Sequence, residues 1–263
     1  MKIVVCIKQV PNTNEVKINK ETGTLIRDGV PSIINPDDKN AIEAALHLKE
    51  TLEDVTVTIL SMGPPQAAIA LKEAIAMGAD NAILLSDRVF GGSDTWATAT
   101  ILAKAIETIG NVDMILCGRQ AIDGDTAQVG PEIAEFLQIP QITYVSELKI
   151  DGNEVAAKRN TEDGYFIIKS PMPVLLTCIK ELNTPRYARP SLIYKAFADD
   201  DNIKIWSNKD IGADVTQIGV KNSPTNVYRS FVPVREFHGE ILQGSVKEAS
   251  SALVERLHEL NIL

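Results

Sequence analysis

The stretch "CGRQAIDGDTAQVGPEIAEFL", residues 117–137, joins the end of an apolar run to the start of an apolar-periodic segment. Connections between a strand and a helix in α/β proteins usually need about 2–6 residues, and this one is longer. Residues 123–130 carry two glycines, two aspartates, a threonine and a glutamine, all small or hydrogen-bonding. The stretch therefore predicts a buried strand, a polar loop with accessible backbone N–H groups, and a helix.

Before this junction, the chain likewise alternates between short apolar runs and segments with helical periodicity. Strands are predicted where short runs rich in Val and Ile are bounded by polar residues, over 2–8, 55–61, 81–86 and 112–117. Helices are predicted where apolar residues recur at helical spacing, over 37–50, 64–80 and 93–110. Such alternation predicts an α/β fold with a parallel sheet and helices on both faces.

After residue 137 the pattern changes to β-like runs separated by Asp-Gly pairs. These pairs occur at 151–152 and 163–164. Asp-Gly between β-like runs is a strong signal for a hairpin. We therefore expect antiparallel strands attached to the edge of the parallel sheet.

The C-terminal part of the chain lacks a sustained period until residue 244. Residues 244–263 then form an amphipathic helical pattern, whose apolar stripe is Val246, Ala249, Leu253, Leu257 and Leu260. An irregular segment ending in one such helix cannot easily bury its own apolar surface. We predict a nucleotide-binding domain over 1–190 and an arm over 191–263 that reaches onto a partner; packing of the arm on its own domain stays open as the alternative.

Composition excludes several classes of function. The chain has 263 residues and a formal net charge of -9, which argues against binding to nucleic acid because phosphate neutralisation needs a basic face. No apolar run approaches the roughly 18 residues of a membrane span. We therefore expect no nucleic-acid and no membrane interaction.

Cysteines and histidines show no spacing typical of a metal site. The three cysteines stand alone in apolar runs, at Cys6, Cys117 and Cys178. The histidines are equally scattered, at His47, His238 and His258. We predict free cysteines acting as small apolar side chains, no metal site and a reducing compartment, the cytoplasm.

The segments that follow the predicted strands indicate a nucleotide site. Ligands of open α/β sheets bind beyond the carboxyl ends of the strands, where helix N-termini present free N–H groups to phosphates. The segments "GGSDT" (91–95) and "DGDTAQVG" (123–130) follow two of these strands. Each has a purely structural alternative, the capping of the next helix. Neither GxGxxG nor GxxxxGK[ST] occurs, so the Rossmann and Walker fingerprints are absent.

The start of the helix after residue 123 has two interpretations. Asp125 with Gln128 resembles a capping box, whereas Pro131 favours a helix that starts near Gly130. Both leave free N–H groups from Thr126 to Gly130. Since carboxylates would repel a phosphate, we expect Asp123 and Asp125 to hold the loop or to contact ribose hydroxyls.

At these residues the sequence resembles the β subunit of electron transfer flavoproteins over essentially the whole chain. The matching stretches are "NPDDKNAIEAAL" (35–46), "AMGAD" (76–80), "CGRQAIDGDTAQVGP" (117–131), "VAAKRNTEDGYFIIKSPMPVLLTC" (155–178) and "NTPRYARP" (183–190). The resemblance implies an αβ heterodimer in which the α subunit carries an FAD and the β subunit binds a nucleotide and embraces α. It places nucleotide contacts at Cys6, Asn35, Pro36, Asp37, Asp38, Met62, Ala121, Ile122, Asp123, Gly124, Asp125, Thr126, Ala127, Gln128, Val129, Gly130, Pro131 and Glu132.

The segment "DRVFGGSDTWATA" (87–99) follows the third predicted strand. It is similar to that of the bifurcating members of this family, in which the β subunit holds a second FAD that NADH reduces. In this interpretation the small loop admits a bulky ring and its polar groups bond a flavin or a pyrophosphate; the residues are Gly91, Gly92, Ser93, Asp94 and Thr95. No side chain is expected to act as a catalytic acid or base. The alternative is a scaffold subunit that binds AMP.

The resemblance also implies partners. They are the α subunit, an acyl-CoA dehydrogenase-type enzyme, and ferredoxin or flavodoxin as a second electron acceptor. NADH oxidation is expected only in the αβ complex. The segment "RYARPSLIYKAF" (186–197) occupies the region that AMP-type members use to anchor the dehydrogenase, with Pro190 and Ser191 where a leucine-centred loop is expected.

Overall fold

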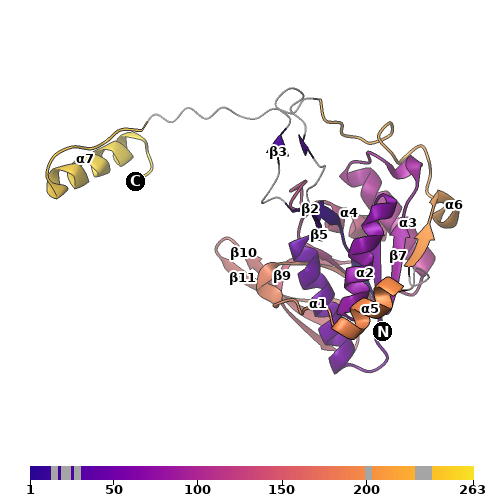
Figure 1. Cartoon of the computed structure of the whole chain (residues 1–263). Coiled ribbons are helices and arrows are strands. Elements are labelled where there is room, and N and C mark those ends of the chain that lie inside the picture. The colour runs from indigo at the N-terminus through magenta and orange to yellow at the C-terminus, as the bar shows by residue number, and fades with distance from the viewer. Residues whose placement is uncertain (13–16, 19–24, 27–30, 199–202, 229–238) are drawn as a thin grey trace. The chain divides into compact units, whose positions relative to one another are not determined.

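The computed structural model of the chain describes residues 1–12, 17–18, 25–26, 31–198, 203–228 and 239–263 (Figure 1). The chain divides into two compact units, Met1–Tyr228 and Arg229–Leu263. The predicted division into a nucleotide-binding domain over 1–190 and an arm over 191–263 stays a prediction.

One large sheet forms the centre of the first unit, in the strand order β11-β10-β9-β12-β8-β1-β6-β7-β13. Its strands are β1 (Lys2–Cys6), β6 (Thr56–Met62), β7 (Asn81–Leu85), β8 (Met114–Gly118), β9 (Gln141–Asp151), β10 (Glu154–Thr161), β11 (Gly164–Pro171), β12 (Val174–Cys178) and β13 (Ile203–Trp206). In the part of the sheet that runs β9-β12-β8-β1-β6-β7-β13, every pair of neighbouring strands is parallel. At the other end, β10 pairs antiparallel with both β9 and β11. The predicted parallel sheet with antiparallel additions is confirmed.

Two short antiparallel pairs complete the described strands of this unit. One joins β2 (Gln9–Pro11) to β5 (Ser32–Ile34), and the other joins β3 (Lys17–Ile18) to β4 (Leu25–Ile26). The first pair leads the chain from the end of β1 to the start of the first helix.

Helices cover both faces of the sheet, as predicted. The α-helices of the first unit are α1 (Pro36–Thr51), α2 (Ala68–Met77), α3 (Thr95–Ile109), α4 (Val129–Phe136), α5 (Pro190–Ala198) and α6 (Asn208–Ile211), and its 3-10 turns are η2 (Pro65–Ala67), η3 (Arg88–Phe90) and η4 (Lys180–Leu182). Helix α7 (Val246–Glu259) belongs to the second unit. Helices α1 and α2 share one apolar cluster with the sheet, and α3 and α4 share a second one. Figure 1 shows α1, α2 and α5 on the same face.

Strand β1 shows how the sequence builds these two clusters. Side chains of a strand alternate between the two faces of a sheet. Ile3 and Val5 accordingly lie in the cluster with α1 and α2, and Val4 and Cys6 lie in the cluster with α3 and α4. An unbroken apolar run is therefore needed at this position, because β1 is buried on both faces.

The position of β12 differs from the sequence expectation. Both Asp-Gly hairpins form, between β9 and β10 and between β10 and β11, but the chain then returns into the sheet. There β12 pairs in parallel with both β8 and β9. Its five residues are all buried, so the run "VLLTC" needs cover on both faces and cannot serve as an edge strand.

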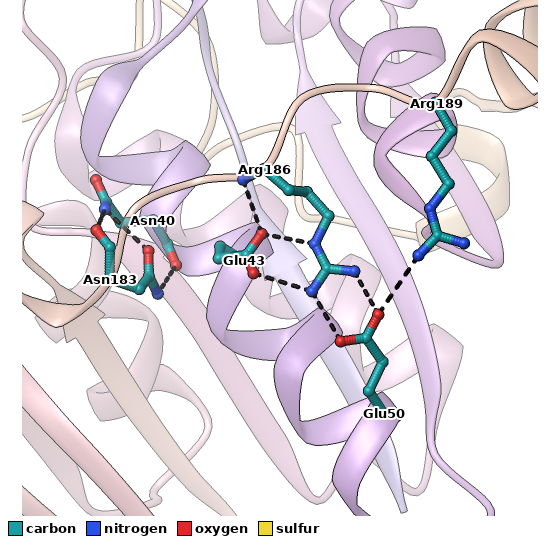
Figure 2. A network of polar contacts seen from close by, with 6 residues as sticks. All are labelled: Asn40, Glu43, Glu50, Asn183, Arg186 and Arg189. Atoms are coloured by element: carbon teal, nitrogen blue, oxygen red, sulfur yellow. Dashed lines mark hydrogen bonds and ion pairs between the residues drawn. The ribbon is translucent and has the colours of Figure 1, made fainter.

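Residues 183–189 connect the sheet to α5, and side chains bind this segment to α1 (Figure 2). Asn40 Nδ2 donates a hydrogen bond to the carbonyl oxygen of Asn183 at 2.7 Å, and Asn183 Nδ2 donates to that of Asn40 at 3.0 Å. Arg186 then bonds to two glutamates of α1. These contacts fix the point from which α5 packs against α2.

Replacement of Arg186 by alanine is expected to lower the free energy of unfolding by about 2 kcal/mol. Its guanidinium donates to Glu43 Oε2 at 2.8 Å and to Glu50 Oε2 at 3.0 Å, and the Glu43 side chain is only 13% exposed. The variant leaves that carboxylate without its cation. Urea unfolding checks the prediction, with Arg189→Ala as the matched control. The Arg189 side chain is 63% exposed and lies 3.7 Å from Glu50, so that control should change the free energy by less than about 0.5 kcal/mol, and an equal loss in both variants would contradict the account.

The second unit contains α7, which confirms the helix predicted near the C-terminus. Its N-terminus has a capping box in which Ser245 and Glu248 bond to each other's backbone N–H. Within the described residues of this unit, no side chain of α7 is buried, and Val246 and Leu260 of the apolar stripe are 86% and 61% exposed.

Candidate functional site

The order of the strands creates a switch point between β8 and β1. From β1 the chain adds β6 and then β7 on one side, and β8 returns to the other side of β1. In open α/β sheets, ligands bind in the crevice outside the carboxyl ends of the strands at such a point. A cavity of about 350 Å³ lies there, lined by the residues that follow β1 and β8 and by the N-termini of α3 and α4.

The structure brings together predicted residues from every segment that the sequence singled out. Those lining the cavity are Cys6, Asp38, Met62, Ser93, Asp94, Thr95, Ala121, Gly124, Asp125, Thr126, Ala127, Gln128, Val129 and Gly130. Other predicted residues lie outside the lining, namely Asn35, Pro36, Asp37, Gly91, Gly92, Ile122, Asp123, Pro131 and Glu132. Their binding role stays a prediction, and several of them hold the lining residues in place.

Sequence reasoning did not select some of the residues that line the cavity. These are Ile7, Lys8, Thr98, Leu102, Cys117, Gly118, Arg119, Gln120 and Ile133. Lys8 and Arg119 stand next to the ends of β1 and β8, so the rule that sites form at the carboxyl ends of strands is the signal that could have found them.

Asp38 joins the two strands of the switch point. Its buried carboxylate accepts hydrogen bonds from the backbone N–H of Lys8, which follows β1, at 2.7 Å, and from that of Gly118, at the end of β8, at 2.9 Å. Burial raises the pKa of this carboxyl to about 7, although the two N–H groups lower it. Asp38 therefore acts as a clamp between the loops that line the cavity.

Asn35, the residue before α1, makes a second clamp. Its Nδ2 donates to the carbonyl oxygen of Gln120 at 2.8 Å, and its Oδ1 accepts from the N–H of Ile122 at 3.0 Å. Since both the donor and the acceptor of this buried amide are engaged, Asn35 shapes the loop after β8.

The loop after β8 is also held by its own aspartates, which confirms the first of the two roles expected for them. Asp123 accepts from Lys8 Nζ at 2.7 Å, and Asp125 accepts from Gln120 Nε2. Asp125 and Ala127 have positive φ angles of 55° and 53°, which turn the chain sharply before α4.

Helix α4 begins at Val129, with Gln128 as its N-cap residue and Pro131 in its first turn. The capping box between Asp125 and Gln128 is therefore not formed, and residues 119–128 are a true loop. Within the described chain, the N–H groups of residues 126–130 have no hydrogen-bond acceptor. Successive free N–H groups of this kind form a concave anion-binding surface at a helix N-terminus.

The segment "GGSDT" caps α3, as its structural interpretation predicted, and three of its residues also line the cavity. Asp94 is the N-cap residue of α3 and accepts from the N–H of Ala97 at 3.0 Å. Thr95 Oγ1 contacts Gln128 Oε1 at 3.2 Å and Glu132 Oε1 at 3.1 Å, which joins α3 to the loop before α4.

Gly92 has a packing role that its sequence interpretation did not include. Its φ angle is +70°, and a Cβ built on it would lie 2.8 Å from Cβ of Val220. A residue with a side chain at this position would clash with Val220 and would strain the backbone.

The electrostatics of the cavity combine two cations with neutral thiols. Arg119 Nε lies 3.6 Å from Asp37 Oδ2, and Lys8 keeps its ion pair with Asp123. Burial raises the pKa of the Cys6 thiol to about 12, so that thiol is an apolar lining group. Cys6, with the other two cysteines, is free and buried, as predicted.

One acceptor beside the cavity has no partner within the described residues. Oε2 of Glu132 is buried and unbonded, and burial raises the pKa of this carboxyl. A ligand hydroxyl or amino group is the kind of donor that such an oxygen needs. Together with the free N–H groups, the site fits a nucleotide.

The described residues contain neither a metal-type cluster nor a spanning helix. No three His, Cys, Asp or Glu side chains among them converge as metal ligands. None of their helices has the length and apolar character needed to cross a bilayer. His238 lies outside the described residues.

The chain is similar to known proteins along its whole length. The model of the electron transfer flavoprotein domain matches residues 22–201. The chain is 54% identical over 263 residues to electron transfer flavoprotein subunit beta of Thermoanaerobacterium thermosaccharolyticum, with 100% of both chains covered. It is 52% identical over 264 residues to the caffeyl-CoA reductase-Etf complex subunit CarD of Acetobacterium woodii, again with 100% of both covered.

A third relative is the acryloyl-CoA reductase electron transfer subunit gamma of Anaerotignum propionicum, at 47% identity over 279 residues and 100% of both chains. The matched domain and these identities agree with the cavity at the switch point of an α/β sheet. The chain is a member of the electron transfer flavoprotein family and belongs to its β-subunit branch.

Proposed function

We propose that the cavity between β1 and β8 holds the adenosine phosphate part of an FAD, and that the chain works as the β subunit of a two-subunit electron carrier. The observation that carries this proposal is the row of N–H groups at residues 126–130, which have no acceptor among the described residues and lie at the switch point of the sheet. Backbone donors at a helix N-terminus suit phosphate without the sequence fingerprint of another nucleotide fold.

Different residues of the chain would bind the phosphates and the base of the nucleotide. The N–H groups of residues 126–130 would hold the phosphates, and the cations of Lys8 and Arg119 would lower the cost of bringing negative charge into the cavity. Apolar side chains from Met62 and Leu102 suit the face of a base. Asp38 lines the cavity, and its oxygens hold the backbone of the two loops around it.

The choice of FAD rests on the loop after β7. Ser93, Asp94 and Thr95 of that loop line the cavity, and the loop resembles that of the bifurcating members. A bound FAD would supply hydride acceptance from NADH and one-electron transfer to a second carrier, chemistry that belongs to the cofactor. The protein would position it and exclude water.

AMP is the second candidate, and the size of the cavity favours it. At about 350 Å³ the cavity lies near the lower end of the range of about 300–1,000 Å³ for ligand pockets. This space suits one nucleotide, so the flavin half of an FAD would extend beyond the cavity. With AMP the chain would be a scaffold and docking subunit.

Partners follow from the family and from the relatives' names. We propose a flavin-bearing α subunit as the obligate partner, which the exposed apolar stripe of α7 would contact. Two relatives are named after caffeyl-CoA and acryloyl-CoA reductases, so an acyl-CoA dehydrogenase-type enzyme is proposed as the electron acceptor. Ferredoxin or flavodoxin is proposed as the second acceptor.

Extraction of cofactors from the purified αβ complex tests the proposal. We expect two FAD and no AMP per heterodimer, and prompt bleaching of flavin absorbance when NADH is added without oxygen. The matched control is the α subunit purified alone, which should retain one FAD and respond weakly to NADH. One FAD with one AMP and no bleaching would replace the FAD proposal by the AMP alternative.

A further inference from the structure

The segment from Gly219 to Thr225 lies against the loop that leads into α3. The N–H of Gly219 donates to Ser93 Oγ at 3.0 Å, and the N–H of Val220 donates to the carbonyl oxygen of Gly91 at 3.2 Å. These residues follow Ile218, which is buried in the apolar cluster of α3 and α4. The segment is thus anchored to the core and hydrogen-bonded to the loop before α3, whose residues Ser93, Asp94 and Thr95 form the rim of the cavity.

Asp94 is the centre of this contact. One carboxylate oxygen caps α3, while the other accepts from both the N–H and Oγ1 of Thr225, each at 2.8 Å. The N–H of Asp94 donates to Oγ of Ser223 at 2.9 Å, and the hydroxyl of Ser223 in turn donates to the carbonyl oxygen of Gly219 at 3.0 Å. Every polar group of Asp94 on this side is used by residues more than a hundred positions away in the chain.

The rim that this contact holds is part of the nucleotide cavity. Ser93, Asp94 and Thr95 line it, and Thr95 bonds to Gln128 of the opposite loop. A displacement of Asp94 would shift the first turn of α3 and thereby the wall of the cavity. Thr225 also lies only a few residues before Tyr228, the end of the first unit.

We infer that residues 219–225 position the rim of the nucleotide site through Asp94, with Ser223 and Thr225 as positioning residues, so that nucleotide affinity depends on a segment which leads directly into the C-terminal unit. The inference rests on the proposed nucleotide site. By linkage, any partner that holds the C-terminal unit and changes this segment must change nucleotide affinity, and the nucleotide must change partner affinity by the same factor.

Two pairs of variants in the full-length chain test the inference. Ser223→Ala removes the buried hydroxyl that accepts from Asp94, and its matched control Ser170→Ala removes another buried serine hydroxyl, on β11. Thr225→Val removes the hydroxyl bonded to Asp94, and its control Thr216→Val removes one bonded to Asp214 instead. Each variant is titrated with FAD and with AMP, and amide exchange of residues 92–97 is followed without nucleotide.

We expect Ser223→Ala to weaken nucleotide binding about tenfold and Thr225→Val about threefold to fivefold, with faster exchange at residues 92–97 in both. Thr225→Ser keeps the hydroxyl and should restore the wild-type values. The controls Ser170→Ala and Thr216→Val should stay within about twofold of wild type.

Wild-type affinity and wild-type exchange in both rim variants would overturn the inference while leaving the proposed function in place. An equal loss in the rim variants and their controls would also overturn it, since the effect would then be one of general stability. Absence of FAD and AMP binding by the wild-type chain would overturn the proposed function, and the inference would fall with it.

Discussion

Replacement of Gly118 by alanine is expected to lower the free energy of unfolding by about 3 kcal/mol and to abolish measurable nucleotide binding. A Cβ built on this residue would lie 2.7 Å from the backbone nitrogen of Asp38 and 2.8 Å from the carbonyl carbon of Asp37. Both atoms belong to the first turn of α1, which cannot move without releasing the clamp on the two loops. Urea unfolding and calorimetric titration with nucleotide measure the two effects.

Gly124→Ala provides the matched control, because this glycine lines the same cavity. A Cβ built on Gly124 meets no atom within 4 Å, so we expect a change of less than about 0.5 kcal/mol. A Gly118→Ala variant as stable as Gly124→Ala would contradict the close approach of β8 to α1.

The second prediction concerns the pH dependence of stability and arises from Asp38. Burial, the largest influence, raises the pKa of this carboxyl from 3.8 to about 7 in the folded chain. Between these values the folded state holds a proton that the unfolded state has lost. The stabilising contribution is therefore complete below about pH 4 and disappears as the pH rises to about 7, a change on the order of 4 kcal/mol.

Asp38→Asn isolates this effect, because asparagine has a similar shape and does not titrate. Free energies of unfolding of wild type and variant are compared from pH 4.5 to 8. We expect wild type to lose stability relative to the variant as the pH rises through this window. Parallel curves for the two proteins would show that Asp38 does not titrate as its burial requires.

The sequence predicted the parts of the fold that depend on local patterns. The alternation of apolar runs and helices was enough for the parallel sheet, and the cap at Asp94 follows from a residue type and its position before a helix. The insertion of β12 between β8 and β9 was not predicted, because pairing across the sheet leaves no local signal. Burial of its run on both faces was the clue.

The sequence was enough to predict which segments form the site, but not what each of their residues does there. Asp38 and Asn35 were expected to contact a nucleotide, and the structure shows their polar atoms engaged with the backbone of two loops. The cation of Lys8 was missed because a single lysine has no motif that marks it, and its place just after β1 was the only signal. The contact of Asp94 with Thr225 joins positions 131 residues apart, and no pattern within either segment could indicate it.

The central claim is that a nucleotide occupies the cavity between β1 and β8, and amide exchange of the full-length chain with and without nucleotide tests it most directly. We expect FAD or AMP to slow exchange at residues 126–130, whose N–H groups have no acceptor in the described chain, and at the start of α3. Another hollow, of about 470 Å³, lies between the C-terminal ends of α1 and α2 and serves as the internal reference. Protection there with unchanged exchange at residues 126–130 would contradict the account.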